Sequence, residues 1–156
     1  MRLVLITAAI TLGFDQLTKW LVVWQMDLAR VGEIEVWPPF LTFRMAWNYG
    51  VNFGLGASSS AAMKWLLIGV ALAITLFVLV WVRRAPPGRA GRIAAGLLVG
   101  GAIGNVIDRL AYGAVADFLN MSCCGFEKPY AFNIADIAIF LGAIGLAFLP
   151  PARRTA

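Results

Sequence analysis

The chain has 156 residues, of which 61% are hydrophobic and 13% are charged, and its formal net charge is +5. Soluble domains carry about 25% charged residues, so this composition argues against a water-soluble protein and indicates one domain in a lipid bilayer. The absence of histidine excludes imidazole zinc sites, the Ser-His-Asp triad and the Cys-His pair. Hydrolytic chemistry would then need carboxylates, lysine or serine, and we expect no metal and no cofactor.

Four apolar segments approach the length of about 20 residues with which a helix crosses the hydrocarbon core. The predicted spans are residues 3–24, 61–82, 93–112 and 133–149. Two prolines follow the last span and end it. A cleaved signal peptide is the alternative for the first segment, but polar residues occupy the place where a cleavage site is expected.

Arginines predict how the chain is oriented. Arg2 precedes the first span, four arginines fill the link between the second and third spans, and two follow the fourth. With four crossings all seven lie on one side, so the positive-inside rule puts both termini in the cytoplasm. Because the basic residues flank apolar runs, we expect no nucleic-acid partner. The predicted fold is an all-α membrane protein with four transmembrane helices, forming one domain over residues 1–156.

Two segments remain for the outer side of the membrane. Residues 25–60 alternate apolar and polar side chains, which predicts short strands. Aromatic residues such as Trp37 and Phe40 suit the headgroup region, so we expect a small β-rich layer on the outer membrane surface. Residues 113–132 are a candidate flap. Their adjacent Cys123 and Cys124 are interpreted as plain loop thiols, with a strained disulfide ring as the alternative.

Ionisable residues within the predicted spans gather in the outer half of the bilayer. At 1.5 Å per residue, Asp15 lies about 18 Å and Lys19 about 24 Å into the first span, and Asp108 about 22 Å into the third. Such residues need partners or a water-filled cavity. Asp15 and Lys19 are four apart on one helix face and can pair. Asp108 and Arg109 are adjacent, so each needs a partner elsewhere, with a pairing across a helix interface as the alternative for Arg109.

Asp117 and Asp136 stand out because no basic residue lies near either in the sequence. Two carboxylates in a partly dry site cannot both ionise easily, so one keeps a proton while the other acts as a base. The base can activate a water molecule against a peptide carbonyl, and the protonated partner can donate to the carbonyl oxygen. The charge pattern therefore predicts an aspartic peptidase.

The polar residues also occur in recognisable strings. These are Asp15-Gln16-Leu17-Thr18-Lys19, Asn48-Tyr49-Gly50-Val51-Asn52-Phe53-Gly54, Gly104-Asn105-Val106-Ile107-Asp108-Arg109 continuing through Gly113-Ala114-Val115-Ala116-Asp117-Phe118, and Phe132-Asn133-Ile134-Ala135-Asp136. Taken in order over nearly the whole chain, they closely resemble lipoprotein signal peptidase, also called signal peptidase II, of bacterial inner membranes. The resemblance implies an aspartic endopeptidase that cuts prolipoproteins just before a diacylglyceryl-modified cysteine.

The resemblance also implies roles for individual residues, with Asp117 and Asp136 as the catalytic pair. Positions near the substrate or supporting the site are Asn48, Gly50, Asn105, Arg109 and Asn133, and structural positions are Asp15, Lys19 and Asp108. The alternative for the three asparagines is that they fix geometry, and Asn133 is also a candidate helix cap. Asn52 departs from the alanine of many family members and is interpreted as a tuned contact. Gly100, Gly101 and Gly104 are predicted close-packing positions between helices.

The implied partners are diacylated prolipoproteins, membrane lipid and a globomycin-type inhibitor, and a monomer suffices because both aspartates lie in one chain. The implied location is the bacterial inner membrane, with the active site toward the outer, periplasmic side. Two other functions stay open. A small proton-coupled transporter also has four short spans and intramembrane acids, although its essential acid is expected near the midplane. A non-catalytic scaffold is the third possibility.

Overall fold

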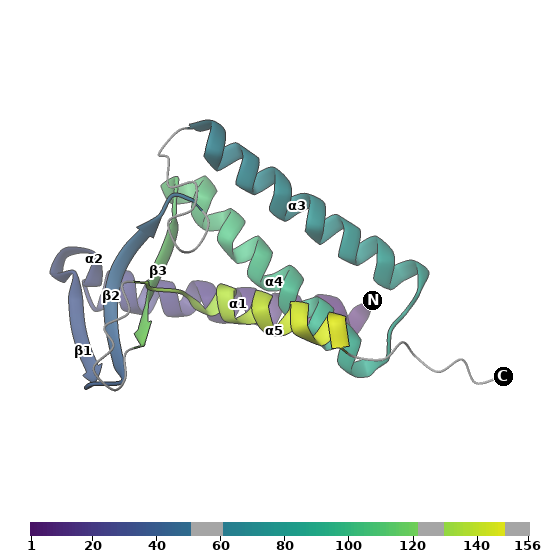
Figure 1. Cartoon of the computed structure of the whole chain (residues 1–156), viewed down its shortest axis with the longest axis horizontal. Coiled ribbons are helices and arrows are strands. Elements are labelled where there is room, and N and C mark those ends of the chain that lie inside the picture. The colour runs from purple at the N-terminus through teal and green to yellow at the C-terminus, as the bar shows by residue number, and fades with distance from the viewer. Residues whose placement is uncertain (51–60, 122–129, 149–156) are drawn as a thin grey trace.

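The computed structural model describes residues 1–50, 61–121 and 130–148. In chain order the elements are α1 (Arg2–Lys19), the π-helical η1 (Trp20–Gln25), α2 (Leu28–Val31), β1 (Glu33–Trp37), β2 (Leu41–Asn48), α3 (Ala61–Arg84), α4 (Arg89–Tyr112), β3 (Val115–Met121) and α5 (Ile134–Phe148). The long helices form a bundle, and the sheet lies at one end of it (Figure 1).

Helix α4 is the centre of the bundle and packs against α1, α3 and α5. Its glycines bring the helix backbones close together, as predicted for these positions. A Cβ atom on Gly100 would lie 2.5 Å from the carbonyl oxygen of Ala8 in α1, and one on Gly101 would lie 2.5 Å from that of Ala135 in α5. Only glycine fits at such contacts, so the small residues of α4 set the spacing of its neighbours.

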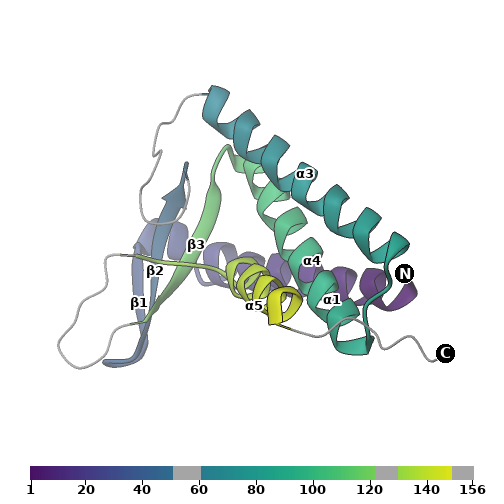
Figure 2. The ribbon, with the colours of Figure 1, turned by 45° about the vertical axis from the view of Figure 1, so that its right-hand side comes forward.

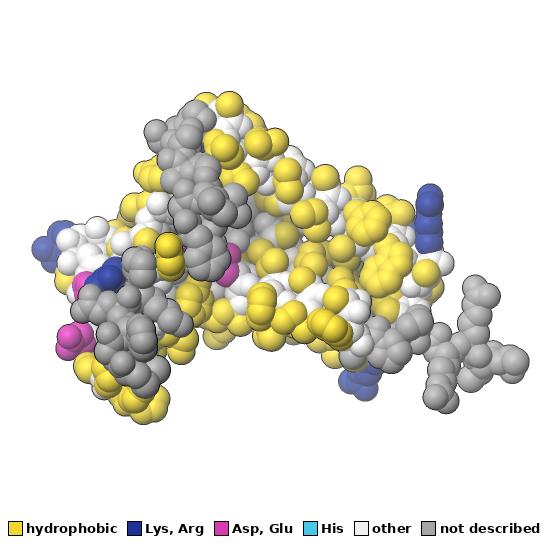
Figure 3. Space-filling view, in the orientation of Figure 1, with side chains coloured by type: hydrophobic (Ala, Val, Ile, Leu, Met, Phe, Trp, Pro, Cys, Tyr) yellow, Lys and Arg dark blue, Asp and Glu magenta, His cyan; other side chains and the backbone are white. Residues whose placement is uncertain are grey.

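Within the described residues, two helices, α3 and α4, are long and apolar enough to cross a membrane by length and composition, and α5 is a shorter apolar helix. Large apolar side chains remain exposed on the bundle, including Phe77 at 70% and Phe140 at 64%. Figure 3 shows that hydrophobic side chains cover much of the helical surface, with lysine and arginine toward the two ends of the molecule. An apolar surface of this extent fits a lipid environment better than water.

The sheet is antiparallel in the order β1-β2-β3. One of its faces packs on η1 and α2 through a cluster that includes Val23, Leu28, Phe43 and Phe118. Figure 2 shows the sheet beside the end of the bundle where α1 finishes, α4 ends and α5 begins. The strands thus bring residues from two segments, far apart in the sequence, up to the helix ends.

The strands β1 and β2 lie within the predicted β-rich segment, but β3 was missed. It belongs to residues 113–132, which the sequence analysis interpreted only as a candidate flap. The first four residues of β3 are all buried, because the strand packs against the sheet's hydrophobic cluster on one side and against helices on the other. A strand buried in this way lacks the alternation of apolar and polar residues on which the prediction depended.

The helices depart from the prediction most clearly in the first and third predicted spans. The first segment changes from α-helix to π-helix at Trp20, and α4 begins at Arg89, four residues before the predicted start. That first turn of α4 carries arginines, so a search for apolar residues cannot find it. The N-terminus, the link between α3 and α4 and the end of α5 all lie at the end of the bundle remote from the sheet (Figure 1). Asn52, Cys123, Cys124 and the predicted last helical residue, 149, lie outside the described residues.

Candidate active site

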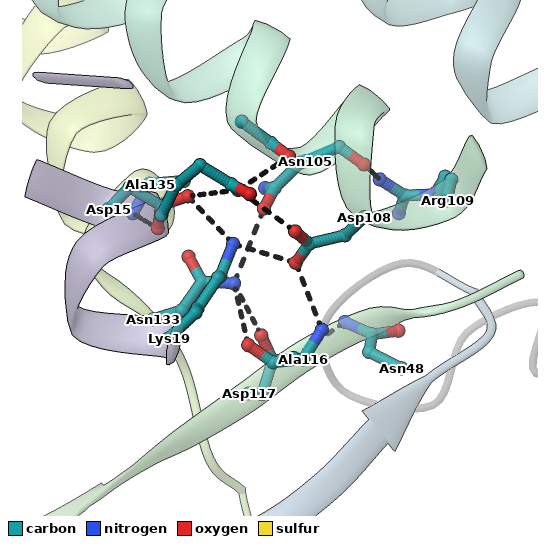
Figure 4. A network of polar contacts seen from close by, with 12 residues as sticks. Asp15, Lys19, Asn48, Asn105, Asp108, Arg109, Ala116, Asp117, Asn133 and Ala135 are labelled. Atoms are coloured by element: carbon teal, nitrogen blue, oxygen red, sulfur yellow. Dashed lines mark hydrogen bonds and ion pairs between the residues drawn. The ribbon is translucent and has the colours of Figure 1, made fainter. Parts of the chain in front are cut away.

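The predicted polar residues converge where the sheet meets the helix ends. Asp15 and Lys19 come from α1, Asn105, Asp108 and Arg109 from α4, Asn48 from β2, Asp117 from β3, and Asn133 from the residue before α5 (Figure 4). Asp117 is 2% exposed, whereas Asp136, in the first turn of α5, is half-buried. The structure thus brings all of these polar positions together at one end of the bundle.

Asn133 caps α5 and fixes the start of the helix, as predicted. Its Oδ1 accepts a hydrogen bond from the backbone N–H of Asp136 at 2.9 Å, and its own N–H donates to Asp136 Oδ2 at 3.4 Å. This reciprocal pair has the pattern of a capping box, in which two residues three apart satisfy each other's backbone N–H groups. The cap also orients the Asp136 carboxylate.

Asn133 also contacts the second aspartate, because its Nδ2 donates to Asp117 Oδ1 at 2.7 Å. The other Asp117 oxygen, Oδ2, accepts from Asn48 Nδ2 at 3.0 Å. Asp136 Oδ1 accepts from Asn105 Nδ2 at 2.9 Å, and Asn105 Oδ1 in turn accepts from Asn133 Nδ2 at 3.3 Å. One amide network therefore holds both carboxylates, which supports the geometric interpretation of the three asparagines.

The environment of Asp117 favours its protonated form. Burial, together with the nearby carboxylate of Asp136, raises the pKa of Asp117 from 3.8 to about 8. The amides of Asn48 and Asn133 and the charge of Lys19 lower the pKa without cancelling the effect of burial. Asp117 is therefore suited to hold a proton at neutral pH beside a more exposed carboxylate.

Arg109 holds backbone carbonyls at the edge of the site. Its guanidinium donates to the carbonyl oxygen of Gly50 at 3.1 Å and to that of Asn105 at 3.2 Å. Asn48 Oδ1 accepts from the N–H of Gly50 at 3.1 Å, so Gly50 is fixed on both sides. Asp108, the partner considered for Arg109 across a helix interface, pairs with Lys19.

The predicted pair of Asp15 and Lys19 is part of a larger buried ion cluster. Lys19 Nζ lies 2.8 Å from Asp15 Oδ2 and 2.7 Å from Asp108 Oδ2. Gln16, which was not predicted as a site residue, also joins the two carboxylates, because its Nε2 donates to Asp15 Oδ2 at 3.1 Å and to Asp108 Oδ1 at 3.0 Å. The only sequence signal was that Gln16 is a polar residue next to Asp15. Its partner Asp108 on α4 is 92 positions away, so local spacing could not predict the contact.

An apolar groove of about 340 Å³ leads to this site between α3, α4 and α5. Its lining residues are Leu67, Val70, Ala71, Ile74, Leu98, Ala102, Asn105, Arg109, Ile139 and Ala143. Eight of these ten side chains are apolar, and the two polar ones are Asn105 and Arg109. Because Asn105 also donates to Asp136, the polar end of the groove connects directly to the aspartates.

Comparison with solved structures gives the class of protein. Two structures described as bacterial membrane enzymes match with TM-scores of 0.78 and 0.77 at 28% and 27% identity. Each match covers 92% of this chain, with 84% and 89% of the respective solved chains. The fold built around these buried carboxylates is thus that of a bacterial membrane enzyme.

The family is given by sequence. A family model described as signal peptidase (SPase) II matches residues 7–149. The lipoprotein signal peptidase of Methylorubrum extorquens (strain PA1) is 42% identical over 96% of this chain and 87% of its own length. That of Rhodopseudomonas palustris (strain TIE-1) is 37% identical over 94% and 90%. The chain belongs to the signal peptidase II family, a family of membrane proteases, and the predicted resemblance is confirmed.

Proposed function

We propose that the protein is an aspartic endopeptidase that removes signal peptides from diacylglyceryl-modified prolipoproteins, cutting immediately before the lipidated cysteine. The observation that carries this proposal is the contact of Asn133 with both aspartates, since its amide donates to Asp117 while its Oδ1 caps the N–H of Asp136. Family membership supplies the substrate class, and the paired carboxylates supply the chemistry.

The two aspartates divide the work according to their burial. Asp117, buried and with a raised pKa, is the acid, and the half-buried Asp136 is the base. The base takes a proton from water as the water oxygen attacks the peptide carbonyl carbon, and Asp117 donates its proton to the carbonyl oxygen. Collapse of the tetrahedral intermediate breaks the C–N bond as Asp136 gives its proton to the departing amine, and Asp117 takes a proton back from a hydroxyl of the intermediate as the carbonyl group re-forms. This sequence of steps uses carboxylates alone.

The groove between α3, α4 and α5 is the proposed site for the lipid-modified part of the substrate. Its lining is apolar apart from Asn105 and Arg109, which lie where the groove meets the aspartates. An acyl chain in the groove would set the position of the peptide bond, and the charge of Arg109 would face peptide carbonyl groups. Asn48 and Gly50 support Arg109 at this polar end, because Asn48 accepts from the Gly50 N–H and Arg109 donates to the Gly50 carbonyl.

We further propose that the chain acts as a monomer in the bacterial inner membrane, with four helices crossing the bilayer and both termini in the cytoplasm. The sheet would then lie at the outer, periplasmic surface, since it is opposite the N-terminus and the link between α3 and α4 (Figure 1). Trp37, at 67% exposure, packs edge-on against Phe40 at the tip of the β1–β2 hairpin. Exposed aromatic pairs of this kind suit lipid headgroups.

The proposal is tested by a gel-shift assay of a diacylated prolipoprotein with purified protein. Wild type should convert the substrate to the shorter form, and Asp117→Asn and Asp136→Asn should not, although both remain folded. Asp27→Asn makes the same chemical change at an exposed carboxylate paired with Arg30, and it should cleave normally. Globomycin should inhibit the wild type. Cleavage at the wild-type rate by either active-site variant would refute the proposal.

The proton-coupled transporter is not favoured by the arrangement of charges. Its essential acid is expected near the bilayer midplane, where alternating access exposes it to both sides. Here Asp117 lies on a strand and Asp136 in the first turn of α5, both at the end of the bundle that carries the sheet. Gradient-driven flux in proteoliposomes that is lost in Asp136→Asn would revive the transporter.

A further inference from the structure

We propose that the buried ion cluster of Asp15, Lys19 and Asp108 is a positioning unit that sets the placement of Asp117 relative to Asp136. The inference rests on the proposed function, because it assigns these three residues a role in aligning the two aspartates for the same reaction. None of them touches the reacting atoms. They act through the backbone of the residue that precedes each aspartate.

Each carboxylate of the cluster accepts a hydrogen bond from one of these preceding residues (Figure 4). Asp15 Oδ1 accepts from the N–H of Ala135 at 2.9 Å, and Ala135 precedes Asp136. Asp108 Oδ2 accepts from the N–H of Ala116 at 3.1 Å, and Ala116 precedes Asp117. The two contacts are equivalent although they come from different helices and reach a helix and a strand.

Lys19 joins the two carboxylates into one unit. Its Nζ lies 2.8 Å from Asp15 Oδ2 and 2.7 Å from Asp108 Oδ2. Gln16 makes a second, neutral link between the same carboxylates through its Nε2. A continuous path of contacts therefore runs from Ala135 through Asp15, Lys19 and Asp108 to Ala116, and it is separate from the path through Asn133.

The fold leaves both N–H groups available for this purpose. Ala135 is the second residue of α5, where backbone N–H groups have no partner inside the helix. Ala116 lies on β3, the edge strand of the sheet, and its N–H donates to the Asp108 side chain, whereas the N–H of Leu119 farther along the strand donates to the backbone of Phe132. Fixing these two N–H groups fixes the backbone from which the neighbouring aspartate side chains extend.

An ionic cluster is a costly way to hold helices together. Asp15 and Asp108 are 0% exposed and Lys19 is 4% exposed, and well-packed apolar residues would often stabilise such a site as well or better. Apolar side chains, however, cannot accept two backbone N–H groups at defined distances. A displacement of about 1 Å between reacting groups can lower the rate by about 100-fold. We therefore infer that the ionic cluster is kept because it holds the backbone beside each aspartate in place.

Gly104→Ala tests the inference without changing any charge. A Cβ atom on Gly104 would lie 2.7 Å from Asp15 Oδ2, so the variant must displace that carboxylate. Gly13→Ala is the matched control, because it adds the same methyl group to α1, at an exposed position with nothing within 4 Å. For a diacylated prolipoprotein in detergent, we expect Gly104→Ala to lower kcat by about 10-fold or more with KM within about 2-fold. Gly13→Ala should match wild type in both.

A double-mutant cycle supplies the second test. Asp15→Asn and Asp108→Asn should each lower kcat, and the double variant should lose little more than the worse single variant, because both break the same unit. Losses in kcat that multiply in the double variant would overturn the inference, as would wild-type kcat in folded Gly104→Ala. Where one set of variants does not fold, the other set decides.

Measuring wild type and Asp117→Asn in the same assay distinguishes a failure of this inference from a failure of the proposed function. If wild type does not cleave, or if Asp117→Asn does, the proposed function fails. If wild type cleaves and Asp117→Asn does not, but Gly104→Ala and the cycle show no selective loss of kcat, only the positioning role fails.

Discussion

Replacing Asp117 with asparagine should make the protein more stable at high pH while it removes activity. The pKa of Asp117 is raised by burial from 3.8 to about 8, so the folded protein keeps a proton that the unfolded chain has lost over that interval. Folding then costs more free energy as the pH rises, by about 1.4 kcal/mol for each unit. The sign is opposite to that of a carboxylate stabilised by a salt bridge.

The magnitude follows from the same two values. Between pH 5 and pH 8 the Asp117 contribution to the free energy of unfolding should fall by about 3.5 kcal/mol, and asparagine removes this dependence. At pH 5 the variant should be about 1 kcal/mol less stable than wild type, because one of the two amide donors, from Asn48 or Asn133, then faces another amide N–H. At pH 8 it should be more stable by about 2.5 kcal/mol.

Thermal unfolding in detergent at both pH values measures the effect, with Asp27→Asn as the matched replacement at an exposed carboxylate. A shift of 1 kcal/mol corresponds to roughly 2–4 °C in Tm for a chain of this length, so the crossover should be readily measured. If the difference in Tm between Asp117→Asn and wild type is the same at pH 5 and pH 8, Asp117 does not hold its proton in the folded protein.

Three further outcomes are expected. Asn133→Ala should lower the free energy of unfolding by about 2–4 kcal/mol, because it removes a helix cap and the Asp117 contact, and it should abolish cleavage; wild-type Tm would contradict this. Lys19→Met should cost about 3–5 kcal/mol, because it leaves two buried carboxylates without a counter-charge, and a near-normal Tm would show that they are otherwise compensated. Ala71→Trp should fill the groove and raise KM with less effect on kcat. Leu76→Trp, at an exposed position on α3 outside the groove, should leave KM unchanged. The same KM in both variants would exclude the groove as the substrate site.

The sequence predicted the helices better than the sheet, for a physical reason. Long apolar runs report burial in lipid directly, so α3 begins at the predicted residue and α5 one residue after the predicted cap. The turn of π-helix at Trp20 and the arginine-bearing first turn of α4 leave no such signal. The pairing of Asp15 with Lys19 was predictable from their spacing on one helix, but the pairing of Lys19 with Asp108 depends on how α1 packs against α4.

The prediction failed most clearly at β3, which is also where a proposed catalytic residue lies. Its backbone lies between the hydrophobic cluster of the sheet and the helix ends, yet it carries Asp117 and Asn120, both almost fully buried. Asn120 Nδ2 donates to the carbonyl oxygen of Tyr130, so each polar side chain has a defined partner. Local patterns fail at functional sites because such sites keep polar groups where packing alone would select apolar ones. The same burial that hid this strand from sequence analysis raises the pKa of Asp117 and so makes it suited to act as an acid.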